Sequence, residues 1–208
     1  MIKNVIFDWS GVINDNRKLC LKVINAIFVE FKAKPLTWKD LRINWQQPYM
    51  LFYKKYIPKI SLATEQRLYN KYYKTIKKEY PSSIFKGMKS LVLELKKQDK
   101  KLFIISSDPL WELNKELEKY GLKGVFTEII SGVHNKQTGL NKIIKKYHCL
   151  KKETVFIGDS THEIECGQKA GTLTIGVTWG FDDPIRIKKM KPTFVANTPK
   201  QLLNFLNK

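Results

Sequence analysis

The sequence predicts an α/β fold with a doubly wound, Rossmann-like parallel sheet. Beyond residue 87, short apolar runs alternate with segments whose apolar residues recur at helical spacing. Strands that alternate with helices form a parallel sheet with helices on both of its faces. The 208 residues are enough for one core with room for a small insertion.

The first half of the chain contains one expected strand and two expected helices. The strand is the apolar run at residues 5–7, which is followed by Asp8. Residues 17–31 and 61–80 have apolar side chains at the three- and four-residue spacing of a helix. Residues 36–60 lie between them, are rich in Trp, Tyr and Lys, and are expected to be irregular.

The second half alternates strictly between helices and strands. Expected helices cover residues 88–95, 110–117, 138–147 and 162–170, with a last helix from residue 198. Expected strands cover residues 102–105, 125–130, 154–157 and 173–177. Gly121 and Gly171 follow two of the helices, at the position where glycine commonly ends a helix.

The charge of the chain is strongly positive. It has 38 Lys and Arg residues against 19 Asp and Glu, a formal net charge of +19, and only four of the basic residues are arginine. Specific readers of nucleic acid favour arginine, whose planar fork binds bidentately. We therefore interpret the excess as a solvated lysine-rich surface, and a nucleic-acid partner as an alternative that the composition does not favour.

The sequence also limits the expected compartment. Three cysteines without a CxxC spacing argue against a disulfide framework and against a zinc site. No apolar run approaches the roughly 18 residues of a membrane-spanning helix. We expect a cytoplasmic protein without a membrane partner, and the sequence leaves its oligomeric state open.

Polar side chains directly follow three of the expected strands. A lysine also lies in the loop after a fourth expected strand, at residues 125–130. They are Asp8 and Ser10 after the first strand, Ser106 and Ser107 after the strand at 102–105, Asp159 and Glu163 after the strand at 154–157, and Lys136 before the helix at 138. Ligands of doubly wound folds bind beyond the carboxyl ends of the strands. If these strands are adjacent and parallel, the side chains converge at one edge of the sheet.

This set of side chains suits phosphoryl transfer. A carboxylate such as Asp8 can attack phosphorus and form an acyl-phosphate intermediate. Hydroxyl and ammonium groups, here Ser106, Ser107 and Lys136, can hold the phosphoryl oxygens where charge spreads in the transition state. Carboxylates supply the hard oxygen ligands that Mg²⁺ prefers. The expected substrate is a small phosphorylated compound.

Four segments resemble motifs of the haloacid dehalogenase superfamily, chiefly its aspartyl-nucleophile phosphatases. VIFDWSGVINDN resembles the first motif, the run ending in IISS the second, the Lys136 loop the third, and VFIGDSTHEIECGQKAG the fourth. The spacing between the first two motifs is similar to that of the C1-capped branch. The resemblance implies a helical cap at residues 16–80, inserted into a catalytic core formed by residues 1–15 and 81–208.

The resemblance also implies roles for individual residues. Asp8 would be the nucleophile, Ser106 and Lys136 would bind the phosphoryl group, and Asp159 would bind Mg²⁺. Glu163 stands where the family more commonly has Asp, so its contact with the metal is expected to run through water. Ser10 would contribute its backbone carbonyl to the metal.

Ser10 is also the main departure from the family pattern. Family phosphatases have a second Asp there, which protonates the leaving group and then activates water. Losing such general acid–base help typically costs ~10²–10⁴ in rate. We therefore expect slow turnover, or turnover limited to good leaving groups.

Two alternatives stay open at this point. The run DWSG resembles the DWAG-like motif of phosphonoacetaldehyde hydrolases, which also need a cap lysine for a Schiff base; Lys39, Lys54 and Lys55 are the candidates. The other alternative is a catalytically degenerate member of the fold that binds a polyanion.

Overall fold

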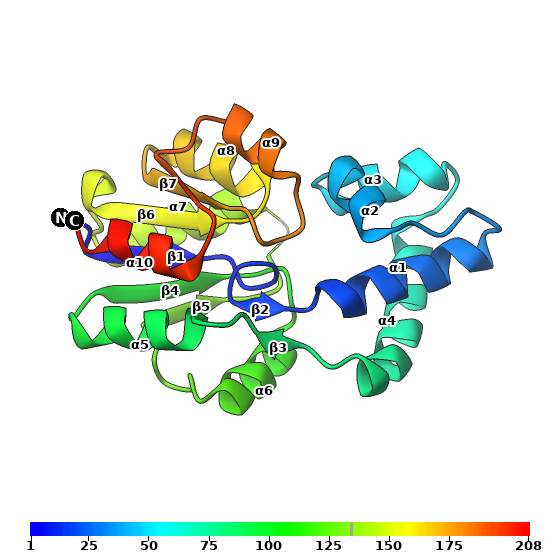
Figure 1. The fold of residues 1–208 in the computed structure, drawn as a ribbon, viewed down its shortest axis with the longest axis horizontal. Coiled ribbons are helices and arrows are strands. Elements are labelled where there is room, and N and C mark those ends of the chain that lie inside the picture. The colour runs from blue at the N-terminus through cyan, green and yellow to red at the C-terminus, as the bar shows by residue number, and fades with distance from the viewer. Residues whose placement is uncertain (134) are drawn as a thin grey trace.

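The structure is a computed structural model that describes residues 1–133 and 135–208 (Figure 1). Its centre is a six-stranded sheet in the order β5-β4-β1-β6-β7-β8, and every neighbouring pair of strands is parallel. The strands are β1 (Asn4–Phe7), β4 (Lys101–Ile105), β5 (Glu128–Ile130), β6 (Thr154–Gly158), β7 (Leu173–Val177) and β8 (Phe194–Ala196). The predicted doubly wound parallel sheet is confirmed.

Helices cover both faces of this sheet (Figure 1). They are α5 (Met88–Lys97), α6 (Leu110–Tyr120), α7 (Lys136–Lys146), α8 (Thr161–Ala170), α9 (Pro184–Lys189) and α10 (Pro199–Leu206). Val5 and Phe7 of β1 pack in one apolar cluster with α5, α6 and α10, whereas Ile6 packs in another with α7 and α8. Alternate residues of a strand point to opposite faces, so one buried strand supplies both clusters.

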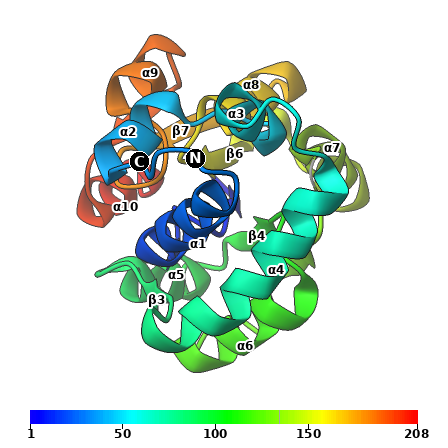
Figure 2. The same cartoon turned by 90° about the vertical axis from the view of Figure 1, so that its right-hand side faces the viewer.

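A second group of helices lies beside the sheet (Figures 1 and 2). It consists of α1 (Arg17–Glu30), α2 (Trp38–Asn44), α3 (Tyr49–Tyr56) and α4 (Leu62–Glu79), which share their own apolar cluster. Two short strands that pair antiparallel, β2 (Asn14–Asp15) and β3 (Ser83–Ile84), lie where the chain leaves and re-enters the core. These helices are called the helical insertion below.

The expectation of irregular structure at residues 36–60 is wrong, because this stretch contains α2 and α3. The side chain of Thr37 accepts a hydrogen bond from the backbone of Asp40, and the Asp40 carboxylate accepts one from the backbone of Thr37. This reciprocal pair satisfies free backbone groups at the start of α2. Helices of two turns contain too few residues for a periodic pattern to be recognised.

Other differences concern short elements. The strand expected at 125–130 is confined to Glu128–Ile130, and α7 begins two residues earlier than expected. The sequence pattern missed β2, β3, β8 and α9, which are two to six residues long. None of the helices in the described residues combines the length and apolarity needed to cross a membrane.

Candidate active site

The three strands that carry the predicted polar residues end at one edge of the sheet. Strand β1 lies between β4 and β6, and both neighbours run parallel to it. Asp8 directly follows β1, Ser106 directly follows β4 and Asp159 directly follows β6. Parallel pairing in register therefore places all three side chains at the carboxyl edge, which is where ligands of such sheets bind.

Lys136 joins this edge from the first turn of α7. The side chain of Asn135 accepts a hydrogen bond from the backbone of Gln137, which fixes the start of this helix. The ammonium of Lys136 lies 2.8 Å from Oδ1 of Asp8 and 2.8 Å from Oε1 of Glu163. All three side chains are buried, so a charge-assisted network lies at the end of β1.

Glu163 is held from a second direction as well. It lies in the first turn of α8, and its Oε2 accepts hydrogen bonds from both the backbone and the hydroxyl of Ser160. Its other oxygen binds Lys136. Both carboxylate oxygens are thus already engaged by this chain.

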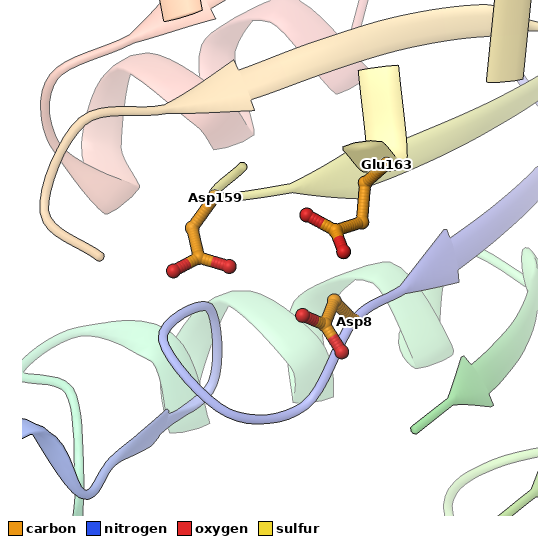
Figure 3. A group of neighbouring side chains, drawn as sticks. All are labelled: Asp8, Asp159 and Glu163. Atoms are coloured by element: carbon orange, nitrogen blue, oxygen red, sulfur yellow. The ribbon is translucent and has the colours of Figure 1, made fainter. Parts of the chain in front are cut away.

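Asp159 completes a group of three carboxylates. Ligand oxygens of Asp8, Asp159 and Glu163 all lie within 4.8 Å of one another, and Figure 3 shows the three side chains directed toward a common space. Oδ2 of Asp159 accepts a 2.6 Å hydrogen bond from the backbone of Phe181. In the part of the chain that the structure describes, Lys136 is the only cation paired with this group.

Burial and mutual repulsion govern the charges of these groups. Burial raises the pKa of Asp8 to about 7, against the opposing attraction of Lys136. Burial, followed by the charges of Glu163 and Asp8, raises the pKa of Asp159 well above its ordinary value. Burial also disfavours ionised Glu163, but Lys136 and Ser160 outweigh it and lower the pKa of that carboxyl. The single positive charge of Lys136 does not balance the negative charge that the three buried carboxylates carry when all are ionised.

Close approach of the backbone to Asp159 requires a glycine. Gly11 has φ +85°, and a Cβ added there would come within 2.1 Å of Oδ2 of Asp159. Any side chain at position 11 would therefore displace the carboxylate or the loop after β1. The loop from Asp8 to Gly11 is shaped around the carboxylate group.

Ser10 and Ser106 meet at a fourth carboxylate, Asp108, which the sequence reasoning did not select as a site residue. The hydroxyl of Ser10 donates to Oδ2 of Asp108 at 2.6 Å, and the hydroxyl of Ser106 donates to the same oxygen at 3.0 Å. Ser10 also accepts a 2.9 Å hydrogen bond from Asn16. Ser107, the remaining predicted phosphoryl ligand, is exposed.

One signal in the sequence could have identified Asp108. It follows Ser106 by two residues beyond the carboxyl end of β4, at the same edge as Asp8 and Asp159. Its contact with Ser10 depends on how two loops approach each other, which sequence alone does not show.

The helical insertion contacts this edge through the loop after β7. The guanidinium of Arg42 in α2 donates to the backbone carbonyls of Thr178 at 2.8 Å and Asp182 at 3.0 Å. The ring of Phe181 lies 5.7 Å from that of Trp38 and 5.4 Å from that of Trp45. Phe181 thus belongs to the apolar cluster of the insertion while its backbone holds Asp159.

Comparison with known proteins now identifies the family. Residues 5–177 match the haloacid dehalogenase-like hydrolases, which is more than half of the chain and includes every polar residue at the sheet edge. The chain belongs to this family. It is a phosphatase-type hydrolase, as the resemblance of the four motifs predicted.

Curated relatives match the chain over nearly its whole length. It is 23% identical to a phosphoglycolate phosphatase of Synechococcus elongatus, over 96% of this chain and 94% of that protein. It is 25% identical to the pyrophosphatase PpaX of Listeria welshimeri, over 97% of this chain and 95% of that protein. The two relatives share the family and differ in their named substrates.

Solved structures share the fold. A haloacid dehalogenase-like hydrolase of Streptococcus pneumoniae superposes with a TM-score of 0.84 at 18% identity, covering 98% of each chain. A predicted phosphoglycolate phosphatase of Haemophilus somnus superposes with a TM-score of 0.78 at 18% identity, covering 98% of this chain and 97% of that one. Both alignments include the helical insertion as well as the sheet.

Proposed function

We propose that this protein is a Mg²⁺-dependent phosphatase that removes phosphate from a small phosphorylated metabolite through an aspartyl phosphate on Asp8. The observation that supports this most is the buried group of Asp8, Asp159, Glu163 and Lys136 at the carboxyl edge of the sheet. It combines a carboxylate nucleophile, an ammonium for phosphoryl oxygens and excess negative charge.

The residues present fit a Mg²⁺ ion. Three carboxylates with oxygens within 4.8 Å face one ammonium, so the group lacks positive charge, and all three are hard oxygen ligands. Asp8, Asp159 and the Ser10 carbonyl would hold the ion; Glu163, whose oxygens already bind Ser160 and Lys136, would hold it through water. When bound, the ion reduces the repulsion between a carboxylate nucleophile and an anionic substrate.

The side chains of the protein would supply the nucleophile and bind the phosphoryl group. Lys136 fixes one oxygen of Asp8 and leaves the other carboxylate oxygen to attack phosphorus. Lys136 and the hydroxyl of Ser106 would bind the phosphoryl oxygens as charge spreads in the transition state. Ser107, which is exposed, would bind at the rim of the site.

Ser10 itself cannot act as a general acid near neutral pH. A simple alkyl phosphate needs a proton on its departing oxygen, whereas an acyl phosphate, an aryl phosphate or pyrophosphate needs little. If no other group supplies that proton, turnover would be slow and limited to such good leaving groups.

We propose that the helical insertion, residues 16–80, is a cap over a catalytic core formed by residues 1–15 and 81–208. Cys20 of α1 lies 3.6 Å from the hydroxyl of Tyr69 in α4. Burial raises the pKa of the Cys20 thiol to about 12, so the thiol stays neutral. The three cysteines of the protein are free thiols, in keeping with a reducing cytoplasm.

The phosphonoacetaldehyde-hydrolase alternative is less well supported. A Schiff-base lysine needs surroundings that favour the neutral amine. Lys39, Lys54 and Lys55 are all exposed on the helical insertion. Trapping with borohydride and the aldehyde substrate tests this alternative, since a labelled cap lysine would support it.

Phosphate release from a panel of substrates tests the proposal. The panel contains phosphoglycolate, pyrophosphate, acetyl phosphate and p-nitrophenyl phosphate, each with Mg²⁺ or with EDTA. We compare the wild type with Asp8→Asn and, as a matched control, Asp99→Asn, which changes an exposed residue before β4 at the far end of the sheet. Turnover should require both Mg²⁺ and Asp8, and should survive in the control. Folded wild type without turnover on any substrate would contradict the proposal.

A further inference from the structure

We propose that Arg42 of the helical insertion is a positioning residue for Asp159, so that the docked insertion raises the affinity of the site for Mg²⁺. The link between them is the segment after β7, residues 178–182, which Arg42 binds and which contacts Asp159. The inference rests on the proposed function, because Asp159 is a Mg²⁺ ligand there. It goes beyond that function in giving a residue of the insertion a part in metal binding.

The segment at residues 178–182 lies directly against Asp159. The backbone N–H of Phe181 donates to Oδ2 of Asp159 at 2.6 Å, and that of Asp182 donates to the backbone carbonyl of Asp159 at 3.3 Å. A Cβ added to Gly180 would come within 2.1 Å of Oδ2 of Asp159, so the backbone closely approaches this carboxylate. The segment therefore holds one carboxylate oxygen and leaves the other for a cation.

The insertion holds both ends of the same segment. The guanidinium of Arg42 donates to the backbone carbonyls of Thr178 at 2.8 Å and Asp182 at 3.0 Å. From the core, Arg186 of α9 donates to the backbone carbonyl of Trp45 in the insertion and pairs with Asp182 at 3.1 Å. The insertion thus fixes the ends of the segment, while the middle of the segment fixes Asp159.

The few arginines of this lysine-rich chain are concentrated at this contact. Only four of the 38 basic residues are arginine. Arg17, Arg42 and Arg186 each donate to a backbone carbonyl across the boundary between insertion and core, whereas Arg67 is exposed on α4. A planar guanidinium binds two acceptors in a fixed geometry, which the flexible ammonium of lysine does not do. Arginine therefore stands where two parts of the fold are held in one relative position.

Docking of the insertion and binding of a cation at Asp159 act on the same segment. The chain passes between core and insertion at β2 and β3, so the insertion can undock as a unit. While the insertion is docked, Asp159 is already oriented, so less conformational freedom is lost when a cation binds. By linkage, the factor by which docking raises the affinity for Mg²⁺ equals the factor by which Mg²⁺ favours docking. One measured affinity therefore reports the coupling in both directions.

Calorimetric titration of the substrate-free protein with Mg²⁺ tests the inference, and its readout is Kd rather than activity. Arg42→Lys retains the positive charge but removes the fork that binds two carbonyls. We expect Kd for Mg²⁺ to rise about tenfold, within the range typical of coupling between two sites. Arg67→Lys is the matched control, because it makes the same replacement at an exposed position, and it should bind Mg²⁺ as tightly as the wild type.

Three further variants separate positioning from a general loss of stability. Arg186→Lys weakens the same contact from the core side, at the Trp45 carbonyl, and should also raise Kd for Mg²⁺. Phe205→Ala removes a ring that stacks on Phe194 away from the insertion, so it should lower the melting temperature and leave Kd unchanged. Asp159→Asn removes the ligand itself and should raise Kd more than any of these changes. A merely structural role of Arg42 would make Kd follow the melting temperature in all variants.

Two outcomes would overturn the inference alone. They are a Kd in Arg42→Lys and Arg186→Lys equal to that of the wild type, and a rise in Kd in Phe205→Ala as large as that in Arg42→Lys. In both cases Mg²⁺ binding that depends on Asp159 would leave the proposed function intact. A folded wild type that binds no Mg²⁺ contradicts the metal site of the proposed function, and the inference fails with it. The wild-type titration therefore distinguishes the two failures.

Discussion

Phe181 and Asp159 are joined by a 2.6 Å hydrogen bond from the backbone of the first to the carboxylate of the second. The ring of the same phenylalanine packs against Trp38 and Trp45 of the helical insertion. The position of the insertion and the position of a predicted metal ligand are therefore set by one residue. A change at Phe181 should affect both.

Phe181→Ala should weaken the docking of the insertion. Phe181 is 6% exposed, and removal of its ring leaves a cavity between the insertion and the loop after β7. We expect KM to rise about tenfold or more, because an insertion that docks less often encloses substrate less often. Steady-state kinetics measure the rise in KM. Tryptophan fluorescence measures the weaker docking of the insertion.

A matched control for this variant is Phe205→Ala. Phe205 is half-buried and stacks on half-buried Phe194 of the edge strand β8, with ring centroids 4.5 Å apart, away from the insertion. Its loss should lower the melting temperature without a comparable rise in KM. Equal changes in KM for both variants would show that Phe181 has no special part in docking.

Mg²⁺ should raise the melting temperature of the wild type. Repulsion within the group of Asp8, Asp159 and Glu163 is relieved when a cation binds the folded state, and selective binding to the folded state stabilises it. Asp159→Asn should remove most of the shift, and Asp99→Asn should retain it. Differential scanning fluorimetry with Mg²⁺ or EDTA measures this without reference to activity. An undiminished shift in Asp159→Asn would contradict the metal site.

Glu65 should make the stability of the helical insertion depend on pH. Burial raises the pKa of Glu65 to about 7, with Tyr53 and Tyr49 partly opposing the shift. The folded state therefore holds this proton more tightly than the unfolded chain. Its contribution to stability is fully present below about pH 4.5 and is lost as the pH rises through about 7.

Replacing Glu65 by Gln should remove this dependence. We expect Glu65→Gln to melt close to the wild type at pH 5 and a few degrees higher than the wild type at pH 8. Glu79→Gln, at the exposed end of α4, is the control and should show no such difference between the two pH values. A Glu65→Gln variant with the same offset from the wild type at both pH values would contradict the prediction.

Glu116 should be essential for stability rather than for chemistry. This buried carboxylate accepts hydrogen bonds from Trp9 at 2.7 Å and Asn14 at 3.1 Å, and Ser82 also donates to it. Glu116→Ala leaves these buried donors without an acceptor, at a cost of about 1–3 kcal/mol or more. Urea unfolding measures the loss. A loss below about 0.5 kcal/mol, the range of ordinary surface changes, would contradict this role.

The local pattern of the chain was sufficient for the larger elements. The alternation beyond residue 87 predicted β4, β6 and β7 and the helices between them, because buried strands and amphipathic helices differ in period. It did not predict α2 and α3, whose two turns hold too few apolar repeats, or strands of two or three residues. Such elements form where capping groups and neighbouring segments supply their hydrogen bonds.

The sequence by itself determined the strands and the polar residues that follow them. In a parallel sheet the carboxyl ends of all strands lie at the same edge, so residues that follow different strands are brought together there. Asp8, Ser106, Asp159 and Lys136 could therefore be selected before their distances were known. Only the tertiary structure decided which side chains touch. The contact between Ser10 and Asp108 joins residues 98 positions apart, and its 2.6 Å length depends on how two loops pack, which local sequence does not encode.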